Sequence, residues 1–193
     1  MSRICDSLRE LSDVTSFEPR PVPVEAVCDA LEAVRMSPSA GNVQPWEVAI
    51  LSDQAVIGRL SECTLDPFMR DDPFLKPSWI GLAPIVAVVC MDVRRARARS
   101  GEAGERFATG DIGAAVVCFR IALKESGLSS GVVREFDAAK VRRAIGAPEW
   151  VRPEVLVGIG YSGEEAYEAP SLEVQDFAHW GAWDRRLECG ARG

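Results

Sequence analysis

The segment from residue 107 to residue 126 predicts a helix that is apolar around almost its whole circumference. One stripe of that helix collects Ile112, Ala115, Val116, Phe119, Ala122 and Leu123. Val117, Cys118 and Ile121 fill much of the remaining surface. Because such a helix is stable in water only when other elements cover it, the rest of the chain must fold around it. We expect the helix to be buried, with a contact between subunits as one way of covering it.

A continuous β-branched run at 84–91 predicts a strand that is covered on both faces. Apolar spacing and turn-forming residues divide the remaining chain into shorter elements. Helices are predicted over 24–36, 53–60 and 136–145, and further strands over 46–51 and 155–161. No repeat or linker is strong enough to split the chain. We therefore expect one α+β domain over residues 1–193, with 1–16 as an N-terminal segment and 163–193 as a C-terminal tail.

The charge balance excludes two broad classes of partner. The chain has 22 Lys and Arg against 29 Asp and Glu, a formal net charge of −7. A surface this acidic repels nucleic acid and anionic lipid, so we expect neither as a partner. No signal-peptide pattern is visible, the longest apolar run is too short to span a bilayer, and the six cysteines form no C-x-x-C pair. These features predict a reduced, cytoplasmic protein.

Side chains suited to metal or acid–base chemistry are scarce. His179 is the only histidine, which excludes paired-histidine metal sites and leaves a single imidazole base. Its place in an aromatic tail, next to Trp180 and near Trp183, favours packing or a contact with a partner subunit. We predict no catalytic side chain and no metal site. The chemistry of an enzyme with this composition belongs to a molecule that it binds.

Two loops are candidates for binding such a molecule. The segment 37–46 is dense in turn formers, and it offers backbone N–H groups, the Ser39 hydroxyl and the Asn42 amide to a planar hydrogen-bonding ligand. The segment 127–131 has two glycines that permit close approach of the backbone. Each loop also has a purely structural interpretation, as a well-capped connection and as a helix C-cap at Gly127 respectively.

The run Ser37-Pro38-Ser39-Ala40-Gly41-Asn42-Val43-Gln44-Pro45-Trp46 closely resembles a segment of the nitroreductase family of flavoproteins. Further resemblances follow in the family's order along the chain. They are the strand 83–89 followed by Asp92, the long helix from Asp111, the Gly127-Leu128-Ser129-Ser130 loop, and a late strand ending in Gly160-Tyr161. Together they cover roughly residues 17–162.

This resemblance implies an α+β fold with a central mixed sheet surrounded by helices, in an intertwined homodimer wrapped by the tail 163–193. It also implies FMN at the subunit interface. Pro38, Ser39 and Asn42, with Ala40 and Gln44 as weaker candidates, would contact the flavin from one subunit. Gly127, Leu128 and Ser129 would supply backbone contacts along the flavin edge. The implied reaction is ping-pong, with NAD(P)H reducing FMN and FMN reducing an electron-poor small molecule.

The sequence departs from the family where the FMN phosphate would be held. Family members typically open with Arg-Arg-Ser-x-Arg-x-Phe, and alignment on Phe17 places residues 11–15, Leu-Ser-Asp-Val-Thr, there instead. After Tyr161, where a second basic pair is usual, the chain supplies acids at 164, 165 and 168. The candidates for a substitute by charge alone are Arg9, Arg20, Arg94, Arg95, Arg97 and Arg99. The four arginines at 94–99 also fit a solvated face paired with Glu102 and Glu105.

An alternative to FMN catalysis therefore stays open. In this alternative, the chain is a divergent member of the family that acts as a binding module, holds a different ligand, or consumes a flavin as its substrate. The proline-rich stretch at 64–82 is expected to be a surface excursion or lid, and it contains no recognisable chemistry.

Overall fold

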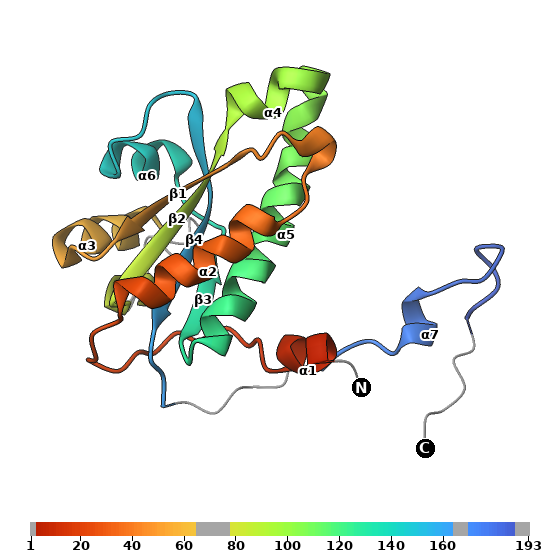
Figure 1. Cartoon of the computed structure of the whole chain (residues 1–193), viewed down its shortest axis with the longest axis horizontal. Coiled ribbons are helices and arrows are strands. Elements are labelled where there is room, and N and C mark those ends of the chain that lie inside the picture. The colour runs from red at the N-terminus through yellow and green to blue at the C-terminus, as the bar shows by residue number, and fades with distance from the viewer. Residues whose placement is uncertain (1–2, 65–77, 164–169, 188–193) are drawn as a thin grey trace, which may run out of the picture.

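The computed structural model describes residues 3–64, 78–163 and 170–187 (Figure 1). In chain order the elements are α1 (Arg3–Arg9), α2 (Val24–Met36), the 3-10 turn η1 (Ala40–Asn42), β1 (Trp46–Leu51), α3 (Gln54–Cys63), the 3-10 turn η2 (Trp79–Leu82), β2 (Ile85–Asp92), α4 (Val93–Ser100), α5 (Ala103–Glu125), β3 (Ser129–Val133), α6 (Ala138–Ala144), β4 (Val151–Gly160) and α7 (Val174–Phe177). Most of the excursion predicted at 64–82 lies outside the described residues. No described helix has both the length and the apolar character needed to cross a membrane.

The four described strands form one sheet in the order β1-β2-β4-β3, and every pairing in it is antiparallel. The α+β expectation is confirmed, whereas the expected mixed sheet is wrong for these strands. The mixed sheet was implied by the family resemblance alone, because the burial of a strand on both faces predicts a central position but carries no information about the direction of its neighbours.

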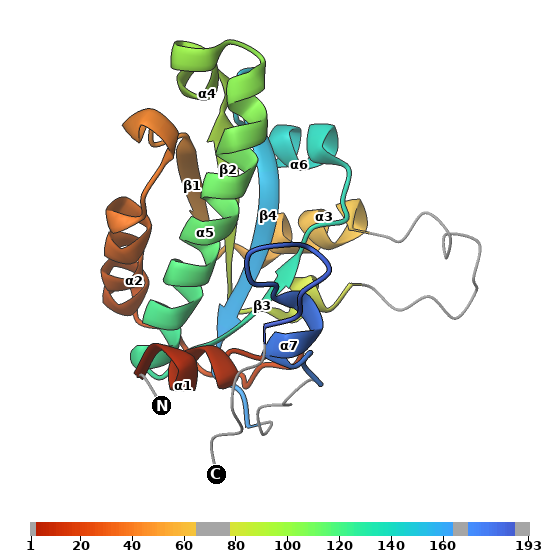
Figure 2. The same cartoon turned by 90° about the vertical axis from the view of Figure 1, so that its right-hand side faces the viewer.

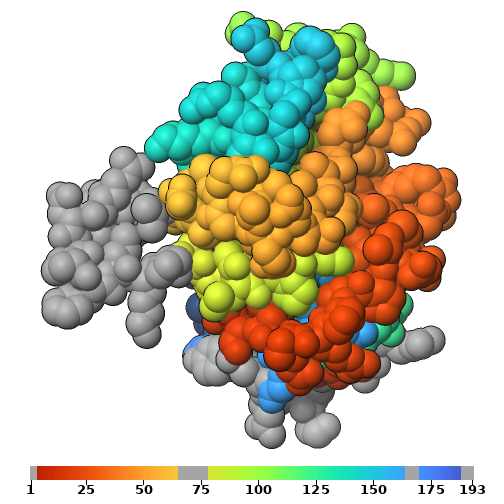
Figure 3. Space-filling model, turned by 90° about the vertical axis from the view of Figure 1, so that its left-hand side faces the viewer, coloured from red at the N-terminus to blue at the C-terminus, as the bar shows by residue number. Residues whose placement is uncertain are grey.

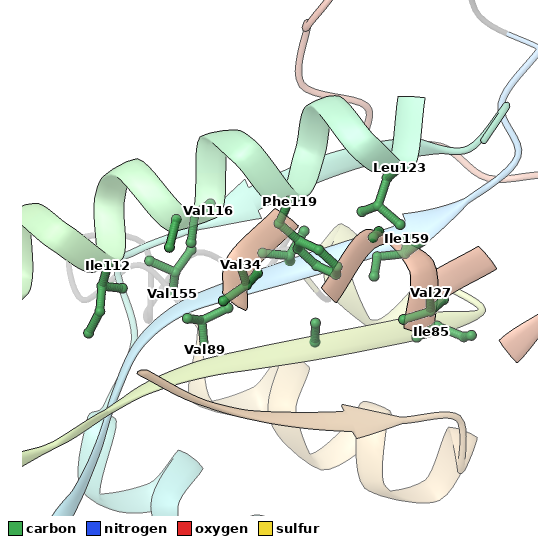
Figure 4. Close-up of a cluster of buried hydrophobic side chains, with 14 of the residues drawn as sticks. Val27, Val34, Ile85, Val89, Ile112, Val116, Phe119, Leu123, Val155 and Ile159 are labelled. Carbon is green, nitrogen blue, oxygen red and sulfur yellow. The ribbon is translucent and has the colours of Figure 1, made fainter. Parts of the chain in front are cut away.

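Helices cover both faces of this sheet, and β2 contributes to both cores. Its residues Ile85, Ala87, Val89 and Met91 face α2 and α5, whereas Val86, Val88 and Cys90 face α3, α6 and η2. Figure 4 shows the first core, where Phe119 and Leu123 of α5 lie above Ile159 of β4. Figure 3 shows α3 and α6 side by side on the opposite face. The alternation follows from the two-residue period of a strand.

Helix α5 is the longest element and runs the full height of the molecule (Figure 2). It begins four residues before the predicted start and ends where expected, since Gly127 has a φ of 76° and follows the last turn. Its inner stripe is buried as predicted. Its outer face is less covered, with Phe107 46% and Val117 38% exposed in the single chain.

Four helices and strands were not predicted, and β3 matters most among them for the site. The Gly/Ser composition of 127–131 favours a loop, yet Ser129 to Val133 pair with β4. Gly131 lies opposite Gly158, and the Trp79 ring fills the space above both: a Cβ built on Gly131 or Gly158 would lie 2.9 Å or 2.7 Å from ring atoms. The glycines thus make room for Trp79 and not for a ligand. The short helices α1 and α7 and the arginine-rich helix α4 are the other three.

Gly131 also permits close approach of the N-terminal segment. A Cβ there would lie 2.2 Å from the Val14 carbonyl oxygen, which cannot move without displacing residues 11–17. We expect Gly131→Ala to lower the free energy of unfolding by about 1–3 kcal/mol through overpacking. The control is Gly58→Ala in α3, where nothing lies within 4 Å of the new Cβ. That change is expected to stabilise the helix slightly. Urea unfolding measures both, and equal stabilities would contradict the packing argument.

Candidate functional site

The loop between α2 and β1 has an unusual backbone. Gly41, Asn42 and Gln44 have φ values of 62°, 54° and 45°, all in the left-handed region. A left-handed conformation is uncommon for residues other than glycine, and it persists only where surrounding contacts hold it. Asn42, the only asparagine of the chain, is exposed at this turn. The composition of the loop predicted a turn, and the structure adds a strained surface that presents the Asn42 amide.

Hydrogen bonds to α5 and within the loop maintain this conformation. The Ala40 N–H donates to the Asp111 carboxylate of α5 over 2.9 Å. The backbone N–H of Gln44 donates to the Ser39 hydroxyl oxygen over 2.9 Å. The side-chain amide of Gln44 donates to Asn42 Oδ1 over 3.2 Å. Ser39 thus accepts from the backbone and keeps its own hydroxyl proton for another partner. Pro38 is exposed beside it.

Helix α4 binds the C-terminal end of the loop between α2 and β1. Arg95 donates to the carbonyl oxygens of Gln44 and Trp46 over 2.9 Å and 3.2 Å, and it also pairs with Glu47. Asp92 caps α4 by accepting from the N–H groups of Arg94 and Arg95. The hydrogen bond from the Arg94 guanidinium, supported by these backbone donors, lowers the pKa of the buried Asp92 carboxyl to about 2.

The arginine cluster is therefore largely paired within the chain. Arg97 pairs with Glu105 over 2.5 Å, as the structural interpretation predicted, whereas Arg94 pairs with Asp92 over 2.9 Å. Arg99 packs against the loop, because a Cβ on Gly41 would lie 2.7 Å from its Cδ atom. The guanidinium groups of Arg94, Arg95 and Arg97 are thus engaged by carboxylates.

The second predicted segment lies at the other end of α5. Gly127 ends the helix, Leu128 is buried, and Ser129 starts β3. Leu128 and Ser129 line a small cavity with Ser12, and Ser12 also lines an adjoining cavity of about 780 Å3. That larger cavity is bordered by Cys5, Leu8, Arg9, Leu11, Ser12, Asp13, Arg120, Ser171, Leu172 and Glu173. Its volume falls within the range of ligand pockets in proteins.

Arg120 is the important residue here that sequence reasoning missed. It lies on the apolar helix α5, and its side chain is only 10% exposed. Nε donates to the Ser130 hydroxyl over 3.1 Å, and Nη2 donates to the Ser12 carbonyl over 3.0 Å and contacts the Asp13 carboxylate over 2.7 Å. Burial lowers the pKa of Arg120, and the Asp13 charge opposes that shift. An arginine inside an apolar helix is a sequence signal for such a site, because buried arginines are almost always paired.

The structure does not bring the two predicted segments together within one chain. The first is held by Asp111 near the start of α5, and the second follows its end (Figure 1). At a rise of 1.5 Å per residue, the 16 residues from Asp111 to Gly127 separate them by about 24 Å along the helix axis.

The tail and the end of β4 hold the remaining candidates. His179 stacks on Trp183 with ring centroids 4.5 Å apart, which agrees with a packing role. The Arg20 guanidinium lies 3.7 Å from the centre of the Tyr161 ring. The acids at 164, 165 and 168, where a basic pair is usual, lie outside the described residues.

Comparison with known proteins identifies the protein family of this chain. The family model described as "Nitroreductase family" matches residues 12–161. The chain therefore belongs to the nitroreductase family, which is a family of oxidoreductases, and the expectation drawn from the Ser37–Trp46 segment is confirmed.

Individual relatives are distant but cover most of the chain. An "NADH dehydrogenase" of Thermus thermophilus is 25% identical over 86% of this chain and 90% of its own length. A "5,6-dimethylbenzimidazole synthase" of Rhodospirillum rubrum is 29% identical over 83% of this chain and 82% of its own. The structure of the NADPH:FMN oxidoreductase from Vibrio harveyi, complexed with NAD+, superposes with a TM-score of 0.78 at 15% identity, covering 97% of this chain and 80% of the other. This last likeness shows the fold.

The buried Asp92 makes a pH-dependent contribution to stability. Its folded pKa of about 2 lies below the ordinary value of 3.8, so its stabilisation is present above pH 4 and is lost as the pH falls towards 2. We expect Asp92→Asn to lower the free energy of unfolding by about 1–2 kcal/mol at pH 7. Urea titrations between pH 2 and pH 7 measure the difference from wild type, which is expected to shrink below pH 4.

The matched control is Asp53→Asn at the N-cap of α3. Asp53 accepts from the Ala55 N–H, and no arginine of the described residues pairs with it. We expect a smaller loss of stability there. A difference for Asp92→Asn that stays constant down to pH 2 contradicts the assignment.

Proposed function

We propose that this chain is a homodimeric, FMN-dependent oxidoreductase that takes hydride from NAD(P)H and passes it to an electron-poor small molecule in a ping-pong cycle. Membership of the nitroreductase family supports the reaction class. Relatives named for NADH and for NADPH:FMN chemistry support the choice of flavin and nicotinamide.

The separation of the two candidate segments along α5 is the observation that carries this proposal. A twofold axis that crosses the middle of α5 would place a second copy of that helix antiparallel to the first. The loop 38–42 of one copy would then face residues 127–129 of the other, and each dimer would contain two equivalent sites. Neither site is complete in a single chain.

The surface of the chain is suited to such a pairing. The outer face of α5 combines the exposed Phe107 and Val117 with the small residues Gly110 and Ala114, which permit close approach of a second helix. In the tail, Trp180 and Trp183 are 74% and 85% exposed in the single chain. Exposed apolar surface of this kind marks interaction sites. We assign the tail 163–193 to wrapping the partner, within one domain that spans residues 1–193.

The residues present fit a flavin. The ring system of FMN has an edge of amide and carbonyl groups, for which the Asn42 amide, the Ser39 hydroxyl proton and the exposed Pro38 backbone provide partners. Gly127, with no side chain, permits close approach at the other end, beside Leu128 and Ser129. A cation is also present next to this end, because Arg120 reaches the segment where the family's arginines are missing.

When bound, the flavin supplies the hydride chemistry. The chain's own residues hold and orient the ring system, and burial between two subunits excludes water from it. No side chain of this chain is assigned a proton transfer. We also propose a cytoplasmic location, in keeping with the absence of disulfides among the five cysteines that the structure describes.

Flavin binding tests the cofactor directly. We expect the purified protein to be yellow, and the apo-protein to bind FMN with micromolar affinity or better. Asn42→Ala removes one amide contact, worth about 1 kcal/mol, and should weaken FMN binding roughly fivefold. The variant should stay folded with a small loss of thermal stability, because alanine adopts the left-handed φ of 54° less readily than asparagine. Flavin fluorescence quenching measures the affinity, with Gln54→Ala on the opposite face as a control. A colourless protein that ignores FMN contradicts the proposal.

Mixing two variants tests whether the sites are shared between subunits. Asn42→Ala and Ser129→Trp each impair both sites of their own homodimer. A heterodimer carries both changes in one shared site and leaves the other site intact. Random mixing of equal amounts should therefore restore about one quarter of the wild-type sites. An FMN titration after co-refolding distinguishes the sites of wild-type affinity from the fivefold weaker Asn42→Ala sites, and no recovery of wild-type affinity contradicts a shared site.

A further inference from the structure

The cavity of about 780 Å3 at the C-terminal end of α5 is bordered by the Arg120 guanidinium, which hydrogen bonds within the chain already hold in place. The cavity lies between α1, residues 11–13 and residues 171–173, and Arg120 enters it from α5. Ser12 also borders the small cavity lined by Leu128 and Ser129, so Arg120 lies next to the surface proposed above to contact the flavin edge.

The hydrogen bonds of Arg120 leave part of its guanidinium available. A guanidinium has five N–H donors on three nitrogens. Nε donates a hydrogen bond to Ser130 Oγ. Nη2 donates to the carbonyl oxygens of Ser12 and Ser130 and forms an ion pair with the Asp13 carboxylate. Nη1 makes no hydrogen bond to the described residues. The side chain is thus fixed in place through Nε and Nη2, while Nη1 keeps its two donors for an anion.

We propose that Arg120 binds the phosphate group of FMN, in place of the basic residues that the segment 11–15 lacks. This inference rests on the proposed flavin function. A charged N–H donor with fixed orientation suits a phosphate oxygen, and its immobilisation lowers the entropy lost on binding.

Arg120 is better placed for this role than the arginines suggested by the sequence. Arg94, Arg95 and Arg97 are engaged by carboxylates near the opposite end of α5. Arg99 lies against Gly41, also at that end. Arg20 lies over the Tyr161 ring. Arg9 borders the same cavity, but it pairs with Asp6 over 3.3 Å on the exposed surface of α1.

Asp13 has a defined part in the proposal. Its carboxylate is 52% exposed and contacts Nη2 of Arg120 over 2.7 Å. It therefore balances the buried charge when no anion is present, and it competes electrostatically with a bound phosphate. Removing its charge should strengthen phosphate binding, whereas a purely structural Arg120–Asp13 pair predicts no effect on any ligand.

The experiment compares FMN with riboflavin, which has the same ring system and no phosphate. Dissociation constants of the apo-protein for both are measured by fluorescence quenching in the wild type and in Arg120→Gln, Arg120→Lys and Asp13→Asn. The control is Arg143→Gln, which removes one exposed positive charge from α6 on the other face of the sheet. Circular dichroism confirms that each variant is folded.

We expect the wild type to prefer FMN over riboflavin by roughly 10- to 100-fold, the range for charge-assisted hydrogen bonds. Arg120→Gln should remove most of this preference by weakening FMN alone, and Arg120→Lys should retain part of it. Asp13→Asn should increase the preference, and Arg143→Gln should leave it unchanged.

A folded Arg120→Gln variant that keeps the wild-type preference overturns the inference. If Arg120→Gln does not fold, unchanged preferences in both Arg120→Lys and Asp13→Asn overturn it instead. Equal affinities of the wild type for FMN and riboflavin overturn the phosphate role while the flavin function stands. Binding of neither flavin overturns the proposed function, and this inference with it.

Discussion

Burial of the inner face of α5 against β2 and β4 is the interaction on which the rest of the structure depends. Ile112, Val116, Phe119 and Leu123 lie on one stripe, and together they form much of the core on that side of the sheet. The same helix carries Asp111, which holds the loop after α2, and Arg120, which holds the N-terminal segment. Its length therefore determines the distance between the two candidate halves of the site, and no side-chain adjustment can close that distance within one chain.

Several acidic residues of the chain form ion pairs with the arginines of α4 and α5. Asp92, Glu105 and Glu47 pair with the arginines of α4, and one of these arginines, Arg95, also holds the Gln44 carbonyl at the end of the loop. At the opposite end Asp13 pairs with Arg120. Asp13 takes the serine position of the family's arginine-rich segment, whose basic positions hold Leu11, Ser12 and Thr15 in this chain, yet a guanidinium from another element reaches the same segment. Charge along the sequence is thus a poor guide to charge in the cavity.

Elements with strong periodicity could be predicted, and elements without it could not. The positions of α2, α3, α5 and α6 and of three strands follow from apolar spacing and from capping residues such as Asp53 and Gly127. Strand β3 was missed because Gly131 and its neighbours favour a turn locally, whereas pairing with β4 and packing of Trp79 favour a strand. Tertiary contacts override weak local preferences of this kind.

The sequence by itself determined the family, the α+β class and the two segments that present polar groups, because each depends on short-range patterns of residue type. Only the tertiary structure decided that these segments lie at opposite ends of α5, that the described strands are antiparallel, and that Arg120 meets Ser12 and Asp13 across more than 100 residues of chain. Such relations depend on how distant elements pack, and no local pattern in the sequence encodes them.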